Sequence, residues 1–306
     1  MASQLVALPE VARLSPACIR ILGGNPGKFT LQGTNTYLVG TGRDRILIDT
    51  AEGAATWVDA LKRTLDDEDA TLSAALITHW HADHVGGIGQ LRQLIPDIAV
   101  YQSQIARHSF APSAVGSGIQ DIVDGDTFSV EGATLRAVHT PGHTTDHMAF
   151  VLEQEGSIFA GDNVLGQGTA VFEDLAVYLQ SLTRMQALYI KSDKGGRLLY
   201  PGHGPIVEDG PAKIKEYIQH RQQREDQVAQ LLLTSDKTKT LICPTDCGKP
   251  TPWTAMELVE VIYADVRKDL YPAAERGIIQ ILEKLEGEGK VVKDGHLWLR
   301  HERSSL

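Results

Sequence analysis

The sequence predicts an α+β protein: a four-layer αββα sandwich, in which two β-sheets pack face to face between outer helices, followed by a smaller helical module. Two observations predict this organisation, the first for the sandwich and the second for the smaller module. In each half of residues 1–212, short apolar strands precede a helix, and polar residues come directly after the strands. From residue 213 the pattern changes to long charged helices and one short hairpin. We therefore expect one large domain at 1–212 and a second module at 213–306.

Composition sets the general class of protein. With 306 residues, 42% of them hydrophobic, the chain can build a full core. A net charge of -10 argues weakly against a nucleic-acid-binding surface, which needs a basic footprint. Residues 1–20 contain no apolar run typical of a signal peptide, and no later segment is typical of a membrane span. Three cysteines agree with a reducing compartment, so we expect a cytoplasmic protein without membrane contact.

The first strands lie around a glycine-rich loop. Ile19–Leu22 alternates, and Thr36–Val39 with Ile46–Ile48 is typical of a hairpin closed at Gly40–Gly42. Asp49 ends the second strand of this hairpin. Its carboxylate has two possible roles, and the sequence favours neither. It either orients a metal ligand or a turn amide beneath the metals, or it only caps the turn. Residues 55–65 then carry apolar side chains at helical spacing.

The motif Thr78–His84 is the strongest chemical signal in the chain. It follows the apolar run Ala74–Ile77 and precedes a helix, so its polar side chains lie at a strand end, where α/β proteins place their chemistry. His79 and His81, two residues apart, project to one side, whereas Asp83 and His84 come after the chain has turned. A histidine-rich surface loop is the alternative. The complete pattern favours two adjacent metal positions, with imidazole and carboxylate ligands suited to zinc.

The second half supplies further strand-end donors. Strands at Ile98–Tyr101, 127–130 and 134–138 form a predicted meander that ends near His139, which we expect to be structural. A Pro-Gly turn then presents His143 as a ligand. His147 either faces the substrate or supports a ligand.

Two more strand ends complete the predicted site. The apolar strand 157–161 ends at Asp162, whose carboxylate can bridge two cations. His203, held between two glycines, is predicted to bind the second cation. Between these residues an amphipathic helix is expected at 174–190.

The C-terminal module begins with a charged helix at Lys213–Leu233 and a polar linker at 234–252. Cys243 and Cys247 lie in this linker without further metal donors nearby, so we expect no metal site there. Thr254 and Glu257 form a capping-box pattern before a helix. A further helix at 273–286 and a hairpin at 290–299 complete an arrangement like a winged helix. Because glutamates are abundant in the module, we expect it to pack against the large domain and not to bind DNA.

Four ordered motifs resemble those of the metallo-β-lactamase fold hydrolases: 78–84, 140–143, 161–162 and 201–203. The resemblance covers roughly residues 15 to 220. It implies two divalent cations, with Zn²⁺ expected and Mn²⁺ or Fe²⁺ also compatible with the ligands. One cation would be bound by His79, His81 and His143, the other by Asp83, His84 and His203, with Asp162 bridging. The family's usual Asp-Thr-Gly appears as Asp49–Ala51, which would cost stability if Ala51 needs a positive φ.

Such a centre implies hydrolysis. A hydroxide shared by two cations is a nucleophile at neutral pH, and Asp83 can both bind the second cation and take a proton. A thioester leaves as a thiolate with a pKa near 8.5 and needs no strong acid. RNA cleavage would need a proton donor, for which His147 is the obvious candidate.

Longer stretches resemble one subgroup of the family: Gly23–Leu38, Thr169–Leu175 and the C-terminal module. This subgroup contains lactamase-beta-2-like endoribonucleases and fungal thioesterases of the atrochrysone carboxyl ACP thioesterase type. Residues 220–226 and 274–280 look closer to the thioesterases. The resemblance implies release of a polyketide from the acyl carrier protein of a non-reducing synthase in secondary metabolism. The alternatives are single-strand RNA cleavage, with nucleic acid as partner, and a non-catalytic metal-bound scaffold. The oligomeric state is left open.

Overall fold

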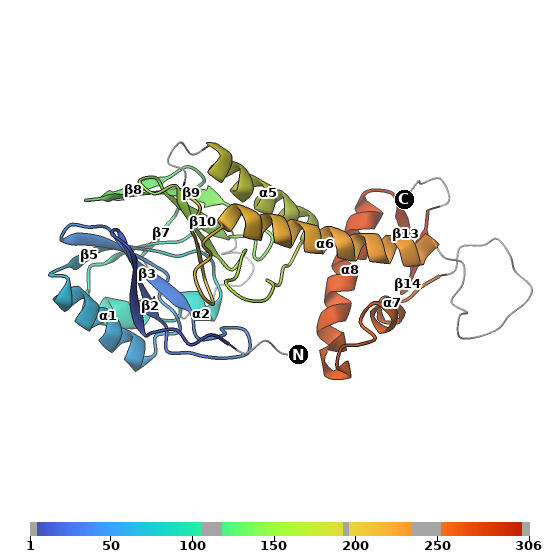
Figure 1. Ribbon diagram of the computed structural model, residues 1–306, viewed down its shortest axis with the longest axis horizontal. Coiled ribbons are helices and arrows are strands. Elements are labelled where there is room, and N and C mark those ends of the chain that lie inside the picture. Colours follow the sequence, from blue (N-terminus) through green and yellow to red (C-terminus); the bar gives the residue numbers. More distant parts are fainter. Residues whose placement is uncertain (1–4, 106–117, 192–195, 234–251, 302–306) are drawn as a thin grey trace, which may run out of the picture. The chain divides into compact units, whose positions relative to one another are not determined.

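The computed structural model describes residues 5–105, 118–191, 196–233 and 252–301 (Figure 1). The chain divides into two compact units: Met1–Glu173 with Val177–Tyr217, and Asp174–Ala176 with Ile218–Leu306. The division falls inside the helix α6 (Gly210–Leu233), so the boundary expected after residue 212 stays a prediction. Among the described residues, none of the helices has both the length and the apolar character that crossing a membrane requires.

The first sheet of unit 1 has seven strands in sequence order. The four N-terminal strands pair antiparallel, whereas the pairs from β4 to β7 are parallel. The strands are β1 (Val11–Ser15), β2 (Cys18–Leu22), β3 (Asn35–Val39), β4 (Asp44–Ile48), β5 (Thr71–Leu76), β6 (Ala99–Tyr101) and β7 (Ile119–Gln120). The sequence did not predict β1, whose residues are mostly half-buried, or β7, which has two residues.

The second sheet has five strands in the order β12-β11-β10-β9-β8. The four strands that come first in the sequence, β8 to β11, form an antiparallel meander, and β12 pairs parallel to β11. The strands are β8 (Thr127–Val130), β9 (Ala133–His139), β10 (Met148–Leu152), β11 (Ser157–Gly161) and β12 (Leu199–Pro201). The pairing of the predicted strands 127–130 and 134–138 is confirmed, because β8 pairs antiparallel with β9. The assignment of Ile98–Tyr101 to the same meander was wrong, because this segment is β6, which pairs parallel with β5 and β7 in the first sheet.

Helices cover the outer faces of the two sheets, and apolar side chains fill the space between the layers. Tyr37 and Phe159 belong to the core between the sheets. On the outer face of the first sheet, Trp57 of α1 (Ala55–Asp67) and Leu91 of α3 (Ile88–Leu94) pack against its strands. The helix α5 (Leu175–Lys191) lies along the second sheet, beside β9 and β10 (Figure 1). The predicted αββα sandwich is thus confirmed.

Strand direction explains why the predicted donors meet. The strands β4 and β5 run parallel, so Asp49 and the motif 78–84 emerge at the same edge of the first sheet. In the second sheet β9, β11 and β12 share one direction, because each is antiparallel to β10 or parallel to β11. His143, Asp162 and His203 follow these three strands. Each sheet therefore presents its donors at the C-terminal ends of its parallel strands.

Ala51 has the positive φ that its place in the turn after β4 requires, at 50°. This conformation costs an alanine about 1 kcal/mol relative to glycine. The methyl group is fully buried in the core beneath α1, which offsets part of that cost. The loss of stability that the sequence predicted for Ala51 is therefore present, but burial of the methyl group makes it smaller.

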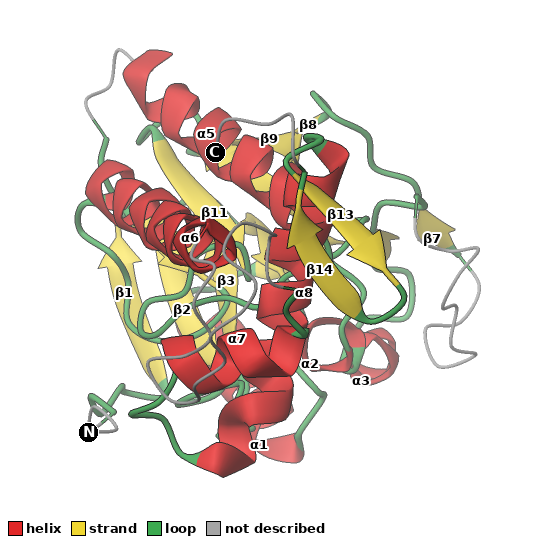
Figure 2. Cartoon of the chain, turned by 90° about the vertical axis from the view of Figure 1, so that its right-hand side faces the viewer, coloured by secondary structure: helices red, strands yellow, loops and turns green. Residues whose placement is uncertain are grey.

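Unit 2 contains α7 (Ala255–Ile262), a short 3-10 helix (Lys268–Leu270), α8 (Tyr271–Gly287) and the hairpin of β13 (Val291–Asp294) and β14 (Leu297–Arg300) (Figure 2). The predicted capping box is present, because Thr254 and Glu257 exchange hydrogen bonds. Lys284 of α8 pairs with the buried Glu225 of α6 at 2.9 Å. Cys243 and Cys247, where no metal site was expected, lie outside the described residues.

Candidate metal centre

Three imidazoles converge at the edge where the two sheets meet. His79 Nε2 lies 3.0 Å from His81 Nδ1 and 3.3 Å from His143 Nε2, and the last two atoms are 3.1 Å apart. Three nitrogens bound to one tetrahedral zinc at about 2.0–2.1 Å would be spaced by about 3.3 Å. The three side chains therefore fit a single cation of this size.

The other ring nitrogens of two of these histidines are held by neighbours. His79 Nδ1 is 3.0 Å from Thr78 Oγ1, and His143 Nδ1 donates to the carbonyl oxygen of Val171 at 2.8 Å. Metal-binding histidines commonly make such a bond, because it fixes the ring and the tautomer. In both cases Nε2 is the atom left to face the cluster.

A second group contains Asp83 and His84, which the short helix α2 (Ala82–Val85) presents, and His203, which follows β12. Asp83 Oδ2 lies 3.1 Å from His203 Nε2 and 3.6 Å from His84 Nε2. These three side chains also offer ligand atoms close enough together for one cation.

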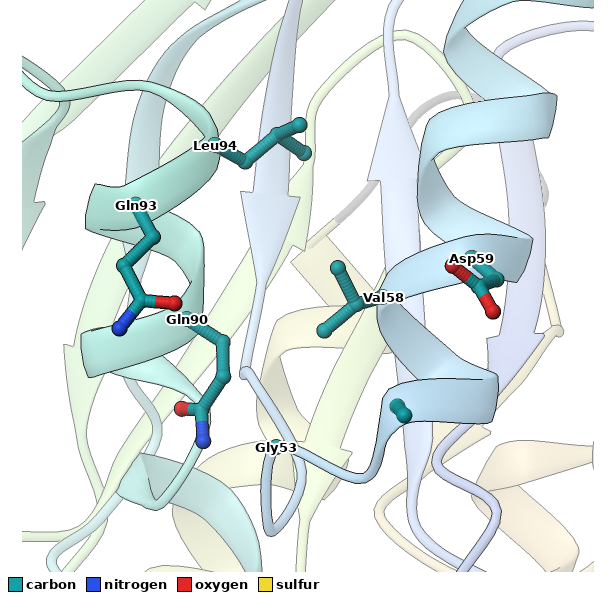
Figure 3. A pocket seen from close by; sticks show the side chains of 7 residues that line it. Gly53, Val58, Asp59, Gln90, Gln93 and Leu94 are labelled. Carbon is teal, nitrogen blue, oxygen red and sulfur yellow. The ribbon is translucent and has the colours of Figure 1, made fainter.

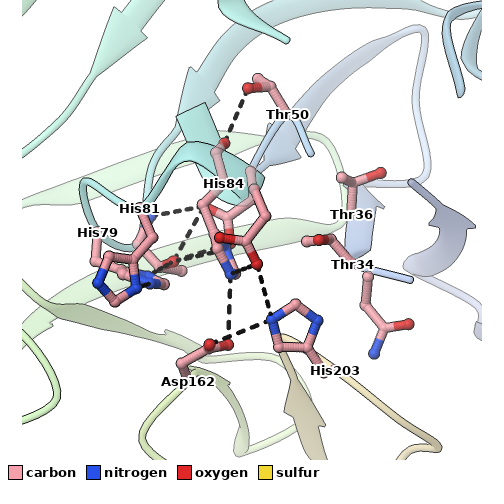
Figure 4. Close-up of polar contacts among 12 residues, drawn as sticks. Thr34, Thr36, Thr50, His79, His81, His84, Asp162 and His203 are labelled. Atoms are coloured by element: carbon pink, nitrogen blue, oxygen red, sulfur yellow. Dashed lines mark hydrogen bonds and ion pairs between the residues drawn. The ribbon is translucent and has the colours of Figure 1, made fainter. Parts of the chain in front are cut away.

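Asp162 lies between the two groups (Figure 4). One oxygen, Oδ1, is 3.4 Å from His84 Nε2, and Oδ2 is 3.2 Å from His203 Nε2 and 3.8 Å from His143 Nε2. Although both are buried, His84 Nε2 and Asp162 Oδ1 have no hydrogen-bond partner among the described residues. Buried polar atoms are rarely left unpaired, so this pair of atoms fits a cation between them.

The surroundings favour neutral imidazoles in the first group and positive charge in the second. Burial, followed by the nearby His84 and His143, lowers the pKa of His79 well below its usual value, and burial lowers the pKa of His81 to about 4. Neutral imidazoles can bind a metal. Burial opposes charge on His203 as well, but Asp162 and Asp83 together outweigh burial and raise the pKa of His203 to about 9. The carboxylates thus favour positive charge at the second group.

Asp49 supports the centre from below. Its Oδ2 accepts from His84 Nδ1 at 2.8 Å, and its Oδ1 accepts from the backbone N–H of Thr78 at 2.8 Å. Asp49 adopts φ 59°, a strained conformation for a residue other than glycine. The carboxylate therefore both orients an imidazole of the second group and closes the turn that begins the histidine motif.

Replacing Asp49 by asparagine should weaken metal binding about 10- to 100-fold. Asparagine keeps an acceptor for Thr78 but places an N–H₂ group against His84 Nδ1, which then cannot donate to it. A chelator-competition titration of the purified protein measures the effect. Asp66→Asn on the exposed face of α1 serves as the control. Equal affinities in the two variants would contradict this role.

His147 lies behind Asp162. Its side chain is fully buried, its Nδ1 is 2.9 Å from Thr140 Oγ1, and its Nε2 accepts from the backbone N–H of Asp162 at 3.3 Å. The ring thus supports the backbone of Asp162, and the alternative of a substrate-facing His147 does not agree with this burial. His139 Nε2 contacts the carbonyl oxygen of Thr145 at 2.9 Å and takes no part in the cluster.

The sequence analysis missed Asn35, which holds the turn that carries His203. Its Nδ2 donates to the carbonyl oxygens of Pro201 and Gly204, each at 2.9 Å, and its backbone N–H donates to Gly202 at 2.7 Å. These partners are more than 160 residues away in the sequence. The signal that the sequence offered was an asparagine at the start of an apolar strand, because asparagine is uncommon in strands.

A cavity of about 220 Å³ reaches the centre at His143 and Asp162. Its other walls are mostly apolar and come from two loops: Lys28, Phe29 and Leu31, and Leu165, Gln167, Gly168, Thr169, Ala170 and Val171. A hollow of about 460 Å³ between α1 and α3 contains none of the predicted site residues (Figure 3). Of these two hollows, the smaller one reaches the centre.

Comparison with known proteins agrees with this arrangement. An Atrochrysone carboxyl ACP thioesterase from Aspergillus chevalieri is 44% identical over 292 residues, covering 94% of this chain and 87% of that protein. The Lactamase-like protein adaB from Aspergillus niger is 43% identical, covering 96% and 87%. A beta-lactamase domain protein from Burkholderia ambifaria shares the fold, with a TM-score of 0.75 at 19% identity, covering 98% of this chain and 96% of that one.

Two parts of the chain match families. Residues 254–298 match the beta-lactamase associated winged helix domain, which agrees with the predicted C-terminal module. Residues 29–208, which include all of the converging histidines and carboxylates, match the metallo-beta-lactamase superfamily. The chain therefore belongs to the metallo-beta-lactamase superfamily and is a metal-dependent hydrolase.

Proposed function

We propose that the protein is a thioesterase that uses two divalent cations to release a polyketide from an acyl carrier protein. The observation that carries this proposal is a mostly apolar cavity that is lined by His143 and Asp162, two of seven converging metal donors. The name of the Aspergillus chevalieri relative supports the substrate class. A cytoplasmic location, expected from the sequence, belongs to the same proposal.

The donors divide between two cations. His79, His81 and His143 would bind one, and Asp83, His84 and His203 the other, with Asp162 contacting both. Zn²⁺ fits these nitrogen and oxygen ligands, as do Mn²⁺ and Fe²⁺. When bound, such a pair lowers the pKa of a shared water to around 7 and polarises a carbonyl oxygen.

Asp83 is the proposed catalytic residue of the chain. Burial would raise the pKa of its carboxyl group, but the hydrogen bond with His203 and the charge of the nearby His84 together outweigh burial and lower the pKa to about 2. The carboxylate is therefore ionised at neutral pH. Its side chain keeps 21% of its surface exposed, so it can accept the proton released when water attacks the thioester.

The surroundings favour a thioester over RNA. A thiolate leaves without a strong acid, whereas an RNA alkoxide needs a proton donor. His147, the donor considered for RNA, is enclosed. Of the residues that line the cavity, Lys28 alone carries a positive charge, and the net charge of the chain is -10. Single-strand RNA cleavage is therefore the weaker candidate.

A paired assay tests the proposal. The metal-reconstituted protein and a chelator-stripped sample are each given a polyketide-loaded acyl carrier protein and a single-stranded RNA. We expect the reconstituted protein to release the acid and leave the RNA intact, and the stripped sample to do neither. RNA cleavage without acid release would contradict the proposed thioesterase function and support the ribonuclease function. A reconstituted sample with neither activity would favour the scaffold.

A further inference from the structure

The loop between β2 and β3 carries exposed side chains into the wall of the cavity. We name Lys28–Leu31 the tip of this loop. Phe29 has 71% of its surface exposed although it lines the cavity, and Lys28 Nζ lies 5.6 Å from the centre of its ring. A large aromatic side chain left in water gains free energy when an apolar partner covers it. The tip therefore presents an apolar ring and a cation side by side, next to the metal donors.

Backbone hydrogen bonds hold the tip. Gly27 N–H donates to the carbonyl oxygen of Leu31 at 3.1 Å, and Gly33 N–H donates to that of Thr30 at 2.8 Å. Thr30 Oγ1 donates to the carbonyl oxygen of Asn25 at 2.6 Å. Leu31 adopts φ 55°, a conformation that leucine rarely takes. Strain of this kind at a cavity wall is typical of functional positions, and a glycine would relieve it.

Gly168–Val171 also line the cavity. Val171 has 61% of its side chain exposed, while its carbonyl oxygen holds His143 Nδ1. The cavity volume of about 220 Å³ is below the range of about 300–1,000 Å³ usual for drug-sized ligands. It therefore accepts only part of a large acyl group, and the exposed Phe29 and Val171 are placed to contact apolar surface at its opening.

We infer that Lys28, Phe29 and Leu31 determine which acyl groups the enzyme accepts. Phe29 and Leu31 contact the face of a flat apolar acyl group, and Lys28 pairs with an acidic oxygen on the same group. Small acyl groups gain little, because they reach the metal donors without touching the tip. This inference rests on the proposed thioesterase function, and it adds the residues that select the substrate.

Three N-acetylcysteamine thioesters test the inference: acetyl, naphthoyl and carboxynaphthoyl. For Phe29→Ala, the ratio of kcat/KM for naphthoyl to that for acetyl should fall roughly 10- to 100-fold relative to the unaltered protein. Leu31→Gly should lower the same ratio without lowering Tm, because glycine accepts the positive φ. For Lys28→Met, the ratio of carboxynaphthoyl to naphthoyl should fall about 2- to 5-fold, as expected for an exposed ion pair.

Val261→Ala is the matched control, since Val261 is 51% exposed and lies on α7, outside the cavity lining. Its ratios should equal those of the unaltered protein. Equal loss on all three thioesters in the tip variants, or no loss, would overturn the inference while leaving the thioesterase intact. An unaltered protein that hydrolyses none of the three and no carrier-bound thioester would instead overturn the proposed function.

Discussion

Replacing Asp162 by asparagine should lower kcat/KM for thioester hydrolysis about a thousandfold. Its two oxygens face His84, His143 and His203, so the carboxylate contacts members of both groups of donors. Asparagine keeps the shape but removes the negative charge and replaces one oxygen by a donor that cannot bind a cation. Loss of a charge that would hold the two proposed cations should cost several kcal/mol, and each 1.36 kcal/mol is tenfold in rate.

Steady-state kinetics and elemental analysis of the same samples measure the effect. The asparagine variant should also retain less metal per chain than the unaltered protein. Asp59→Asn, on the exposed face of α1, makes the same chemical change away from the centre and should leave both quantities unaltered. Full activity with a full metal complement in Asp162→Asn would contradict the shared role of the carboxylate.

A methyl group added at Gly202 should disrupt the centre nearly as strongly. A Cβ atom at this position would lie 2.2 Å from Asp162 Oδ1 and 3.0 Å from His84 Cε1. The side chain of Asp162 would have to move, and that of His84 would have to shift with it. We expect metal affinity to fall roughly 100-fold, as for other displacements of ligand positions, and the free energy of unfolding to fall by about 1–3 kcal/mol.

Gly89 provides the matched comparison, because a Cβ atom there would meet nothing within 4 Å. Gly89 lies inside α3, so Gly89→Ala should raise the free energy of unfolding by about 0.5–1 kcal/mol and leave metal affinity unchanged. Thermal unfolding and chelator competition on the two variants separate the effects. If Gly202→Ala binds metal as tightly as Gly89→Ala, close packing at Gly202 does not shape the centre.

Features encoded within a few residues were predictable from the sequence. The capping box of Thr254 and Glu257 needs only one turn of helix, and the structure confirms it. The converging donors were found because each lies in a short motif that follows an apolar strand, so the motif indicates the position of its donors in the fold. The roles of these side chains as ligands remain predictions, although the distances between their atoms suit two cations.

Features that depend on distant partners were not predictable. Asn35 acts on a turn more than 160 residues away, and no local pattern links the two segments. The enclosure of His147 depends on Thr140 and on the backbone of Asp162, so its sequence neighbourhood left two roles open. Strands as short as β7 carry too few side chains for an alternating pattern to be detected.

Val171 contributes to the metal centre through its backbone and to the cavity lining through its side chain. Its carbonyl oxygen holds His143, whereas its side chain lines the cavity. Every amino acid supplies the same carbonyl oxygen, so a codon change at this position alters what the cavity admits and preserves the hydrogen bond. Related chains could thus diverge in the compounds they process while inheriting an unchanged reactive centre.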